Sequence, residues 1–523
     1  MRRRRNERAN QVDSVVRRRE GAEMTHSGNT IDWQVMADKI VPDARALMHG
    51  KRIDDCADTF DLLSPRDGTL LCTVPSCGQA EVDDAVAHAR AEQRLGCWPR
   101  LTPRKRGEAL GAWADAIEAE RLDLALLVSL ETGKPIRDAV EIDLRGVVRA
   151  IRWYAELADK LHGDHPAVGA NDVALVSREP VGVVGILLPW NFPLALIGYD
   201  VAPALMLGNS VVVKPSERAP LSVLRCCELA VEAGVSRDAL SVVPGVGRET
   251  GQAIGRHADI DSVAVTGAAA TGRAIIRASG ESNGKRVWPE LGGKSAAVVF
   301  KDVRDIDAAA HAVAWGAYFN QGEMCTGCAR VLVEREVYAE FLDAVSAEID
   351  QLRVGDPLDW ATSVGALTTD RQLRDAQLAT EEAVLGGGRV LRGGMSVAPV
   401  AGGRYFAPTL LADAPESSRI FTDEVFAPVA AARPFDDVDD ALRVAFSSGY
   451  GMGISVWTSS IDTAFRVTRA AKAGIAWINC FEGDDLTVPA GGVGRSGFGR
   501  TKGTAVLDKY SDVKTTWVHL GDE

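Results

Sequence analysis

The sequence lacks any apolar run that reaches the roughly 18 residues of a membrane-spanning helix. Its longest apolar stretches, near residues 181–189 and 201–213, are broken by proline or glycine. Basic charge is in deficit, because 59 Lys and Arg residues stand against 72 Asp and Glu residues, which gives a net charge of −13. The absence of a long apolar run argues against a membrane span. The negative net charge argues against a nucleic acid as the partner and favours a soluble globular protein.

The sequence also lacks a disulfide framework and a secretion signal. Its nine cysteines are an odd number scattered over the chain, which suits a reducing compartment, so we expect a cytoplasmic protein. Residues 1–20 hold eight arginines and no apolar core, and we expect residues 1–23 to form a disordered basic tail. The pair Cys325 and Cys328 has no second Cys-x-x-Cys to complete a zinc site, so no metal is predicted; a resting disulfide between the two is the alternative.

The sequence does contain a regular alternation of apolar runs and helical spacing. Short apolar runs predict buried strands at residues 182–188, 210–213, 240–243, 262–265, 296–300 and 329–334. Helical spacing is found at 80–93, 103–133, 140–162, 217–233, 248–256, 269–279 and 305–319. This alternation predicts an α/β protein with a Rossmann-type doubly wound parallel sheet, whose ligands bind at the carboxyl ends of the strands. A second βα unit begins near residue 337, and 523 residues suffice for two or three domains.

The stretch from Gly316 to Arg330, GAYFNQGEMCTGCAR, places Cys325 among small and polar residues. A free cysteine is most often a small buried hydrophobe, so this residue alone would not indicate chemistry. The nearby segment PELGGKSA offers Glu290 as a base, followed by two glycines that would let the backbone approach a ligand closely. Together, Cys325 and Glu290 predict a thiol nucleophile assisted by a carboxylate.

Four motifs carry a family resemblance: PWNFP at 189–193, KPSE at 214–217, ELGGK at 290–294 and FNQGEMC at 319–325. In this order they resemble the NAD(P)-dependent aldehyde dehydrogenase superfamily, and the resemblance runs from about Arg52 to Leu520. It implies an aldehyde dehydrogenase-like fold made of an NAD-binding domain, a second α/β catalytic domain and a small β oligomerisation element. The expected bounds are 24–157 with 181–292, 293–498, and 158–180 with 499–523, respectively. Because the family's final strand joins the sheet of a neighbouring subunit, a homodimer or homotetramer is also implied.

The resemblance implies the catalytic roles as well. Cys325, as a thiolate, would add to the carbon of an aldehyde substrate, and Asn191 with the Cys325 backbone N–H would stabilise the oxyanion that forms. Hydride would leave for the nicotinamide, and Glu290 would activate the water that releases the acid. For Asn191, a turn residue before Pro193 is the alternative.

The implied cofactor is NAD, with NADP as a second option. Lys214 and Glu217 would bond the adenosine ribose, where a carboxylate repels a 2′-phosphate; for this loop, a helix N-cap at Ser216 is a compatible alternative. Glu424 would bond the nicotinamide ribose. The other cofactor residues that the resemblance implies are Pro189, Trp190, Ser216, Gly247, Gly251, Thr266, Gly267, Ala268, Leu291 and Phe426.

Within the superfamily, the segments AIRWYAELADK, KRVWPELGGKSAAVVF and LTVP look most like γ-glutamyl-γ-aminobutyraldehyde dehydrogenase and other ω-aminoaldehyde dehydrogenases, enzymes of polyamine catabolism. Phe192, Tyr199 and Phe481 would form an aromatic wall, and Asp485 would place an acid at the mouth of the substrate channel. Both features suit a cationic chain. The same aromatic residues also suit an aliphatic or aryl aldehyde, so the substrate stays open.

Several positions depart from the family pattern. Asp200 stands where relatives commonly have lysine, and Thr501 where they commonly have an acid; those two family residues are thought to form a proton path to the general base. Ala268 and Ala427 replace a serine and a glycine, and Pro289 restricts the backbone before the base. These changes bear on thioester hydrolysis and cofactor affinity more than on the reaction type.

Two other functions are compatible with parts of this pattern. A CoA-acylating semialdehyde dehydrogenase passes its thioester to a thiol and usually lacks the glutamate, so Glu290 argues against that class. A non-catalytic relative would explain the departures, but the complete set of Cys325, Glu290 and Asn191 argues against it.

Overall fold

The computed structural model describes residues 31–483 and 485–521. The basic tail predicted for residues 1–23 lies outside this described part. Residues 31–40 contain the short helix α2 (Trp33–Ala37), which begins where the Asp32 side chain accepts a hydrogen bond from the Val35 N–H. The other described helices and strands belong to residues 41–521.

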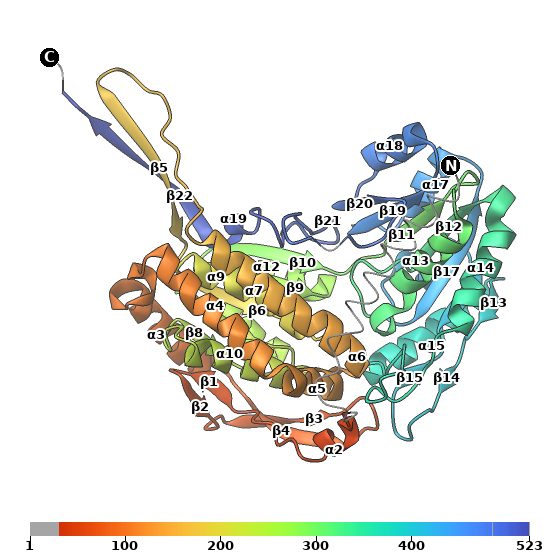
Figure 1. Cartoon of the computed structure of the whole chain (residues 1–523), viewed down its shortest axis with the longest axis horizontal. Coiled ribbons are helices and arrows are strands. Elements are labelled where there is room, and N and C mark those ends of the chain that lie inside the picture. Colours follow the sequence, from red (N-terminus) through yellow and green to blue (C-terminus); the bar gives the residue numbers. More distant parts are fainter. Residues whose placement is uncertain (1–30, 484, 522–523) are drawn as a thin grey trace, which may run out of the picture. The chain divides into compact units, whose positions relative to one another are not determined.

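The first large sheet has seven strands in the order β10–β9–β6–β7–β8–β1–β2 (Figure 1). The five strands from β10 to β8 are parallel, and β1 and β2 extend the edge antiparallel. Every residue of β6 and β7 is buried, which explains the unbroken apolar sequence of β6, VVGIL, and the three valines in the middle of β7, SVVVK. The predicted doubly wound parallel sheet is confirmed. Its strands are β1 (Ala46–Met48), β2 (Lys51–Ile53), β6 (Val183–Leu187), β7 (Ser210–Lys214), β8 (Leu240–Val242), β9 (Ser262–Gly267) and β10 (Arg286–Leu291).

The strand β10 was not predicted, and its proline explains why no strand signal is evident. Pro289 is tolerated because β10 is an edge strand, where no neighbouring strand needs the missing N–H. The Pro289 carbonyl instead accepts hydrogen bonds from the Phe498 and Gly499 N–H groups, at 3.1 and 3.0 Å. The strand thereby brings Glu290 against the loop at 496–499.

Helices pack around this sheet in layers. Side chains of α3, α11 and α12 share one apolar cluster with β6, β7 and β9, whereas α4, α5, α7 and α10 pack against one another in front of the sheet in Figure 1. The helix predicted over 103–133 is divided at Glu120, where α4 ends and α5 begins. The helices are α3 (Gln79–Leu95), α4 (Pro103–Ala119), α5 (Arg121–Thr132), α6 (Ile136–Asp138), α7 (Arg145–Leu157), α8 (Pro193–Leu196), α9 (Ala202–Met206), α10 (Leu221–Glu232), α11 (Gln252–Arg256) and α12 (Ala269–Gly280).

The second large sheet also has seven strands, in the order β13–β16–β17–β12–β11–β19–β20. Only β13, at one edge, is antiparallel to its neighbour. The strands are β11 (Ala296–Val299), β12 (Arg330–Glu334), β13 (Arg389–Arg392), β16 (Thr409–Ala412), β17 (Val429–Phe435), β19 (Gly453–Trp457) and β20 (Ile475–Ile478). The helices of this part are α13 (Ile306–Tyr318), α14 (Tyr338–Asp350), α15 (Asp370–Leu385), α16 (Arg419–Thr422), α17 (Val438–Ala445) and α18 (Ile461–Ala470).

Two apolar clusters cover opposite faces of this second sheet. Ala296 and Val298 of β11 belong to one cluster, and Ala297 and Val299 belong to the other. Successive side chains of a strand point to opposite faces, so a strand that is apolar at every position must have packing on both sides. The helices of this part supply that packing.

A two-stranded ribbon completes the described fold. β5 (Asp172–Pro180) pairs antiparallel with β22 (Ser511–His519) over its whole length, and the ribbon extends away from the two sheets in Figure 1. β22 follows directly after α19 (Leu507–Tyr510). An isolated two-stranded ribbon has little stability of its own. Smaller antiparallel pairs are β3 (Asp58–Leu63) with β4 (Leu70–Ser76), β14 (Ser396–Val397) with β15 (Tyr405–Phe406), and β18 (Tyr450–Gly451) with β21 (Val493–Gly494).

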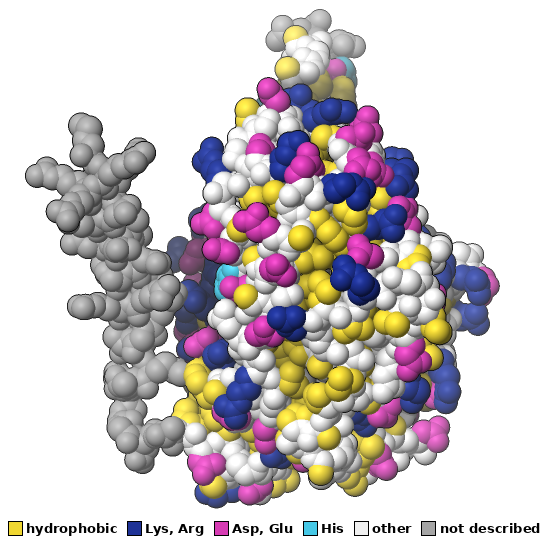
Figure 2. All heavy atoms as spheres, turned by 90° about the vertical axis from the view of Figure 1, so that its right-hand side faces the viewer, with side chains coloured by type: hydrophobic (Ala, Val, Ile, Leu, Met, Phe, Trp, Pro, Cys, Tyr) yellow, Lys and Arg dark blue, Asp and Glu magenta, His cyan; other side chains and the backbone are white. Residues whose placement is uncertain are grey.

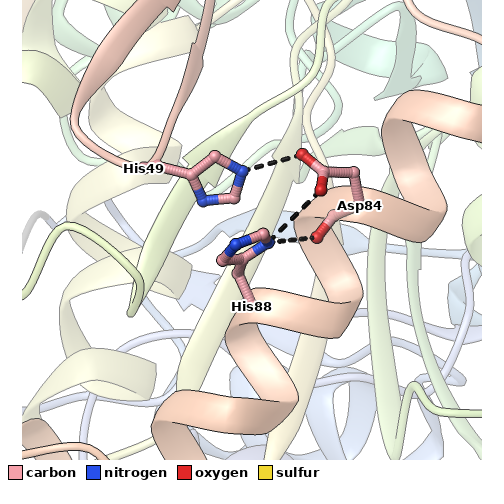
Figure 3. Close-up of side chains that lie close together, drawn as sticks. All are labelled: His49, Asp84 and His88. Atoms are coloured by element: carbon pink, nitrogen blue, oxygen red, sulfur yellow. Dashed lines mark hydrogen bonds and ion pairs between the residues drawn. The ribbon is translucent and has the colours of Figure 1, made fainter.

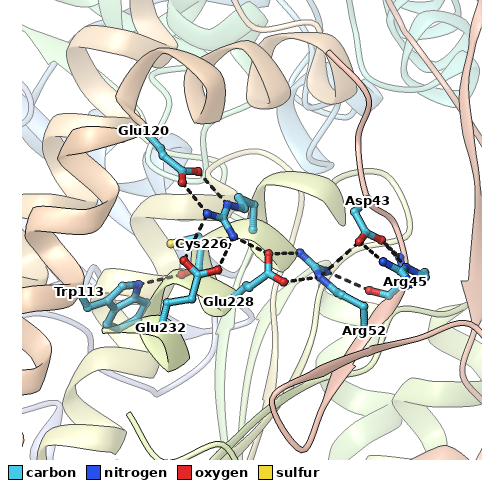
Figure 4. A network of polar contacts seen from close by, with 9 residues as sticks. Asp43, Arg45, Arg52, Trp113, Glu120, Cys226, Glu228 and Glu232 are labelled. Atoms are coloured by element: carbon cyan, nitrogen blue, oxygen red, sulfur yellow. Dashed lines mark hydrogen bonds and ion pairs between the residues drawn. The ribbon is translucent and has the colours of Figure 1, made fainter. Parts of the chain in front are cut away.

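Ionic side chains fasten the outer strand β2 to the helices (Figure 4). Arg225 on α10 donates to Glu120, Glu228 and Glu232. Glu228 also accepts two hydrogen bonds from Arg52 on β2, at 2.9 and 2.8 Å. These side chains are mostly buried, Arg52 at 8% and Glu228 at 24% exposure, and the network fixes how the strand and the helices are aligned.

Two histidines and an aspartate connect the turn between β1 and β2 to α3 (Figure 3). The His49 Nε2 lies 2.7 Å from Asp84 Oδ2, and the His88 Nδ1 lies 3.0 Å from the Asp84 carbonyl oxygen. The two imidazole rings are 3.6 Å apart between centroids. These contacts hold the turn against the helix.

The surface mixes charges of both signs. Figure 2 shows acidic and basic side chains interspersed with apolar ones over the face that it views. Pairs such as Arg335 with Asp436 and Arg443 with Glu416 lie within 2.6 Å of each other. Among the described residues, no helix is both long enough and apolar enough to cross a bilayer.

Candidate active site

A cavity of about 1050 Å³ is lined by the loops that follow β6, β7 and β9 and by residues of the second sheet and its connections. Ligands of doubly wound sheets bind at these carboxyl ends of the strands. Most of the predicted site residues line this cavity: Cys325, Glu290, Asn191, Pro189, Trp190, Phe192, Tyr199, Ser216, Glu217, Thr266, Gly267, Ala268, Leu291, Glu424 and Phe426. The predicted residues outside the lining are Lys214, Gly247, Gly251, Phe481 and Asp485.

A tight turn after α13 positions Cys325. Asn320 and Gln321 adopt left-handed φ angles of 51° and 55°, and Gly322 follows with a φ of 72°. A side chain at Gly322 would lie 2.3 Å from the carbonyl oxygen of Ala427, so only glycine fits. Left-handed backbone in residues other than glycine persists only where the surrounding structure fixes it.

Glu323 is the residue that fixes this turn. Its buried carboxylate accepts hydrogen bonds from the Thr368 N–H at 3.0 Å and from the Gln372 amide at 2.8 Å. Burial raises the pKa of Glu323 to about 8, and the hydrogen bonds from Thr368 and Gln372 oppose that rise. The network ties the cysteine loop to the start of α15.

The surroundings of Cys325 are acidic. Burial, followed by the negative charges of Glu482, Glu424 and Glu290, raises the pKa of the Cys325 thiol to about 12. The side chain is nevertheless half-exposed and lines the cavity. The thiol is therefore almost entirely protonated near neutral pH, and a base must accept its proton before the sulfur can act as a nucleophile.

Asn191 follows β6 and is held rigidly. Its side-chain amide donates to the carbonyl oxygen of Glu323 at 3.0 Å, and its own backbone carbonyl accepts from the Lys134 ammonium at 2.9 Å. Lys134 also forms a buried ion pair with Asp143. A carboxamide carries two N–H donors, so one hydrogen bond to the protein leaves a second for a substrate oxygen in the cavity.

Glu290 lies in a buried ionic cluster. The Lys509 Nζ is 3.0 Å from Glu290 Oε1 and 3.0 Å from Asp200 Oδ1, and the Tyr510 hydroxyl donates to Asp200 at 2.7 Å. Burial raises the pKa of Glu290, Lys509 opposes the rise, and Asp200 adds to it. Gly499 approaches so closely that a Cβ there would lie 3.0 Å from Glu290 Cγ. No motif marks Lys509 in the sequence, although a buried acid at position 200 requires a partner.

The two glycines after Glu290 make room for protein atoms. A Cβ at Gly292 would lie 1.9 Å from Glu424 Oε2, and a Cβ at Gly293 would lie 2.2 Å from the Cys325 carbonyl oxygen. The Gly293 N–H donates to Glu424 Oε1 at 2.9 Å. These glycines therefore allow Glu424 and the cysteine loop to pack beside the base; close approach of the backbone to a ligand stays a prediction, and Gly292 lines the cavity.

The KPSE segment begins at the last residue of β7. Its cation, Lys214, is buried, and its anion, Glu217, is half-exposed. The Lys214 Nζ donates to the Pro215 carbonyl at 2.6 Å and lies 3.5 Å from Glu217 Oε2. Burial lowers the pKa of Lys214. The expectation that Ser216 caps a helix is wrong, because α10 begins only at Leu221; the Ser216 hydroxyl accepts from the Arg218 N–H in a local turn.

The start of α12 suits a phosphate. Ala268 precedes the helix in extended conformation and offers no side-chain cap, so no side chain competes for the first N–H groups of the helix. A helix N-terminus favours an anion. Thr266 to Ala268 line the same cavity as Glu217 and Glu424. These residues fit a dinucleotide, because carboxylates can accept from ribose hydroxyls and the helix start can hold the pyrophosphate.

Two predicted cofactor glycines lie outside that lining. Gly247 and Gly251 bound a single helical turn before α11. A Cβ at Gly251 would lie 3.5 Å from the Leu187 side chain. Gly251 is therefore packed beside β6, whereas Gly247 is exposed and a Cβ there would meet no atom within 4 Å.

Aromatic rings line the end of the cavity beside Cys325. Trp315 stacks on Phe319 with 4.6 Å between ring centroids, and Phe192 lies 6.2 Å from Phe319. Phe481, predicted to line the substrate channel, instead packs edge-to-face against Trp315 and is only 9% exposed. Trp315 also lines the cavity, but no motif in the sequence marks it.

Besides Asp485, which is predicted at the mouth of the substrate channel, the same segment offers a second acid, Glu482. Glu482 lines the cavity. Asp485 is exposed outside the lining, where it accepts hydrogen bonds from the Thr487 N–H and hydroxyl, both at 2.8 Å.

Comparison with known proteins identifies the family. Residues 53–516 match the model described as the aldehyde dehydrogenase family. The chain belongs to the aldehyde dehydrogenase family. It is 40% identical over 476 residues to aminoacetaldehyde dehydrogenase of Pseudomonas aeruginosa, covering 91% of this chain and 95% of that protein.

Solved aldehyde dehydrogenase structures are similar over nearly the whole chain. The γ-glutamyl-γ-aminobutyraldehyde dehydrogenase of Burkholderia cenocepacia has a TM-score of 0.91 and 40% identity, covering 94% of this chain and 99% of that one. An indole-3-acetaldehyde dehydrogenase of P. syringae, solved with NAD⁺ and IAA, has a TM-score of 0.92, 40% identity and the same coverage. The predicted fold and the predicted class of enzyme, an NAD(P)-dependent aldehyde dehydrogenase, are confirmed.

Proposed function

We propose that this aldehyde dehydrogenase oxidises an ω-amino or γ-glutamylamino aldehyde to the carboxylic acid, with NAD preferred over NADP. The observation that carries the proposal is one cavity that contains Cys325, Asn191 and Glu290 together with an acid, Glu482, whose charge raises the pKa of the Cys325 thiol. An acid so close to the nucleophile attracts a substrate with a nearby cationic group. The names of two relatives, an aminoacetaldehyde and a γ-glutamyl-γ-aminobutyraldehyde dehydrogenase, support the same substrate class.

The proposed reaction begins with Cys325 as the thiolate, after its proton has passed through water in the cavity to solvent. The sulfur then attacks the aldehyde carbon, and the second amide N–H of Asn191, with the Cys325 backbone N–H, stabilises the oxyanion of the thiohemiacetal. Loss of one donor of this kind costs about 3–4 kcal/mol in comparable sites. When bound, NAD supplies the acceptor for the hydride.

A thioester on Cys325 is the product of this oxidation. Glu290 accepts a proton from the water that attacks the thioester carbon; the carbon–sulfur bond breaks, and the carboxylic acid leaves. Such base catalysis contributes about 10²–10⁴-fold. The CoA-acylating alternative needs no base here, so Glu290 on the cavity wall argues against it.

A panel of aldehydes tests the proposed substrate class. Aminoacetaldehyde, 4-aminobutyraldehyde, γ-glutamylaminobutyraldehyde, butyraldehyde and indole-3-acetaldehyde are each offered with NAD and with NADP, and the reduced nicotinamide is followed by its absorbance. We expect the highest kcat/KM with an amino or γ-glutamylamino aldehyde and NAD. A kcat/KM tenfold higher for butyraldehyde or indole-3-acetaldehyde contradicts the proposal and favours a substrate that simply fills the aromatic wall.

Replacement of Glu482 tests the source of this specificity. Glu482→Gln removes a charge near Cys325, so we expect KM for 4-aminobutyraldehyde to rise roughly 5- to 30-fold, equivalent to about 1–2 kcal/mol. KM for butyraldehyde should change less than threefold. The matched control is Asp485→Asn, which removes the exposed acid outside the cavity lining. If KM for 4-aminobutyraldehyde rises equally in this control, Asp485 contributes as much as Glu482 to recognition of the cationic substrate.

Replacement of Glu217 tests the cofactor preference. A 2′-phosphate near this carboxylate would place like charges together, which costs about 4 kcal/mol at ~4 Å and an effective dielectric of ~20. We expect wild-type kcat/KM to be higher with NAD, and Glu217→Ser to reduce or reverse the ratio. Glu249→Ser, at an exposed glutamate outside the cavity, is the control. A wild-type preference for NADP that Glu217→Ser leaves unchanged would refute this role.

The assembly and location follow from the same proposal. We infer a homodimer or homotetramer in which the ribbon of β5 and β22 pairs with another subunit, since Val513 and Trp517 on β22 are exposed and free strand edges invite pairing. The domain bounds expected above would make this ribbon part of the oligomerisation element. A cytoplasmic location is supported by nine free cysteines.

A further inference from the structure

The general base Glu290 shares its cation with a second carboxylate. Lys509 bridges Glu290 and Asp200 at 3.0 Å to each, and the side chains of Lys509 and Asp200 are each 1% exposed. The Tyr510 hydroxyl donates to the same Asp200 oxygen that Lys509 contacts. A buried charge is stable only when it is paired and hydrogen-bonded, so the position of each member depends on the others.

The backbone of α19 fixes the cation in place. The carbonyl oxygen of Lys509 accepts a hydrogen bond from the Ser262 hydroxyl at 3.2 Å, and that of Tyr510 accepts from the Asn209 amide at 2.9 Å. Ser262 begins β9, and Asn209 precedes β7. These bonds fix the backbone that carries the Lys509 ammonium to the first sheet. The edge strand of the same sheet carries Glu290.

The charges beside the base differ in sign and position from those that the family resemblance implies. Asp200 occupies the position where relatives commonly carry lysine, and Thr501 occupies that of an acid. The Thr501 N–H donates instead to the Ala490 carbonyl at 2.8 Å. The cation beside the base comes from position 509, and the acid comes from position 200.

We propose that Lys509 and Asp200 are positioning residues for thioester hydrolysis: Lys509 holds the Glu290 carboxylate, Asp200 holds Lys509, and the pair sets the pH range in which Glu290 acts as a base. The inference rests on the proposed function of Glu290. Neither residue lines the cavity, so both act through Glu290.

The two residues have opposite electrostatic effects on the base. Lys509 lowers the pKa of Glu290 against the effect of burial, whereas Asp200 raises it. Arg500 also lowers the pKa of Glu290. Tyr510 and Tyr154, which face Asp200, are buried hydroxyls whose pKa values burial raises above the physiological range, so they do not change charge as Glu290 titrates. The Cys325 thiol also interacts with Glu290, but it carries the acyl group during thioester hydrolysis and does not titrate then.

The sign of each expected shift follows from these charges. Glu290 is active as a carboxylate, so hydrolysis becomes faster as the pH rises through its pKa. Lys509→Met removes a positive charge and should move the midpoint of this rise to higher pH by about one to three units. Asp200→Asn removes a negative charge and should move the midpoint to lower pH. Damage to the fold would lower the rates without moving the two midpoints in opposite directions.

The experiment uses p-nitrophenyl acetate, which acylates a thiol without aldehyde or cofactor. The acetyl group moves from the phenolic oxygen to the Cys325 sulfur as p-nitrophenolate leaves. Water then attacks the thioester carbon, the carbon–sulfur bond breaks, acetate and the thiol are released, and one proton passes to Glu290. The slow phase after the nitrophenolate burst is measured against pH for each variant, in parallel with aldehyde oxidation.

Matched variants separate positioning from structure. Lys509→Arg keeps the charge and should leave the midpoint within about half a unit, and Lys514→Met, at an exposed lysine paired with Glu179, should leave it unchanged. If Lys509→Met does not fold, the nearly isosteric Asp200→Asn still tests the inference, because its pH midpoint should move to lower pH. Unchanged midpoints, or shifts in the same direction, overturn this inference while aldehyde oxidation still supports the proposed function. If the wild-type enzyme neither hydrolyses p-nitrophenyl acetate nor oxidises aldehydes, the proposed function and this inference are both overturned.

Discussion

Cys325→Ala should abolish aldehyde oxidation, with kcat reduced at least about 10⁴-fold, because no other group can form the covalent intermediate. The side chain lines the cavity and the change removes only its sulfur atom, so the affinity for NAD should stay within a few-fold of wild type. Steady-state absorbance of reduced nicotinamide measures the first quantity, and calorimetric titration with NAD measures the second.

Cys328→Ala is the matched control for this nucleophile. Cys328 is fully buried in the apolar cluster beneath the second sheet, and burial raises the pKa of its thiol beyond the range in which it could ionise. Its replacement should cost stability, of the order of 1 kcal/mol for a small cavity, while turnover persists. Turnover by the Cys325 variant, or an equal loss in the Cys328 variant, would remove Cys325 from its proposed role.

Glu290→Gln should separate the two halves of the reaction. The acylation half still produces reduced nicotinamide, but the thioester cannot be hydrolysed with base assistance, so turnover after the first cycle should fall about 10²–10⁴-fold. Stopped-flow absorbance should show a burst of about one reduced nicotinamide per active site, followed by a slow steady rate. Mass spectrometry of the stopped reaction should find the acyl group on Cys325.

The response to coenzyme A completes this test. Added coenzyme A should not restore the turnover of Glu290→Gln if water is the natural acceptor. Restoration to the wild-type rate would favour the CoA-acylating class instead. A variant that shows no burst and an unchanged steady rate would show that Glu290 has no part in hydrolysis.

The strands and the cysteine loop could be predicted because their signals are local. An unbroken apolar run such as β6 requires burial on both faces, and Cys325 lies in a contiguous motif, FNQGEMC. The left-handed turn at Asn320 and Gln321 could not be read from that motif. The edge strand β10 gave no such signal, because Pro289 opposes a strand everywhere except at an edge. Whether a segment is an edge depends on the order of the strands in the sheet.

The sequence by itself determined the family and indicated the proposed nucleophile, the proposed base and the residues at the carboxyl ends of the strands, since each lies in a contiguous motif. Only the tertiary structure decided that Glu482, and not Asp485, lines the cavity, because three residues along a loop separate a cavity wall from the surface. The same holds for Lys509, which lies more than 200 positions from Glu290 in the chain and 3.0 Å from it in space. A buried carboxylate pair can be balanced by a cation from any element that packs against it, and packing is a property of the folded chain rather than of any single segment.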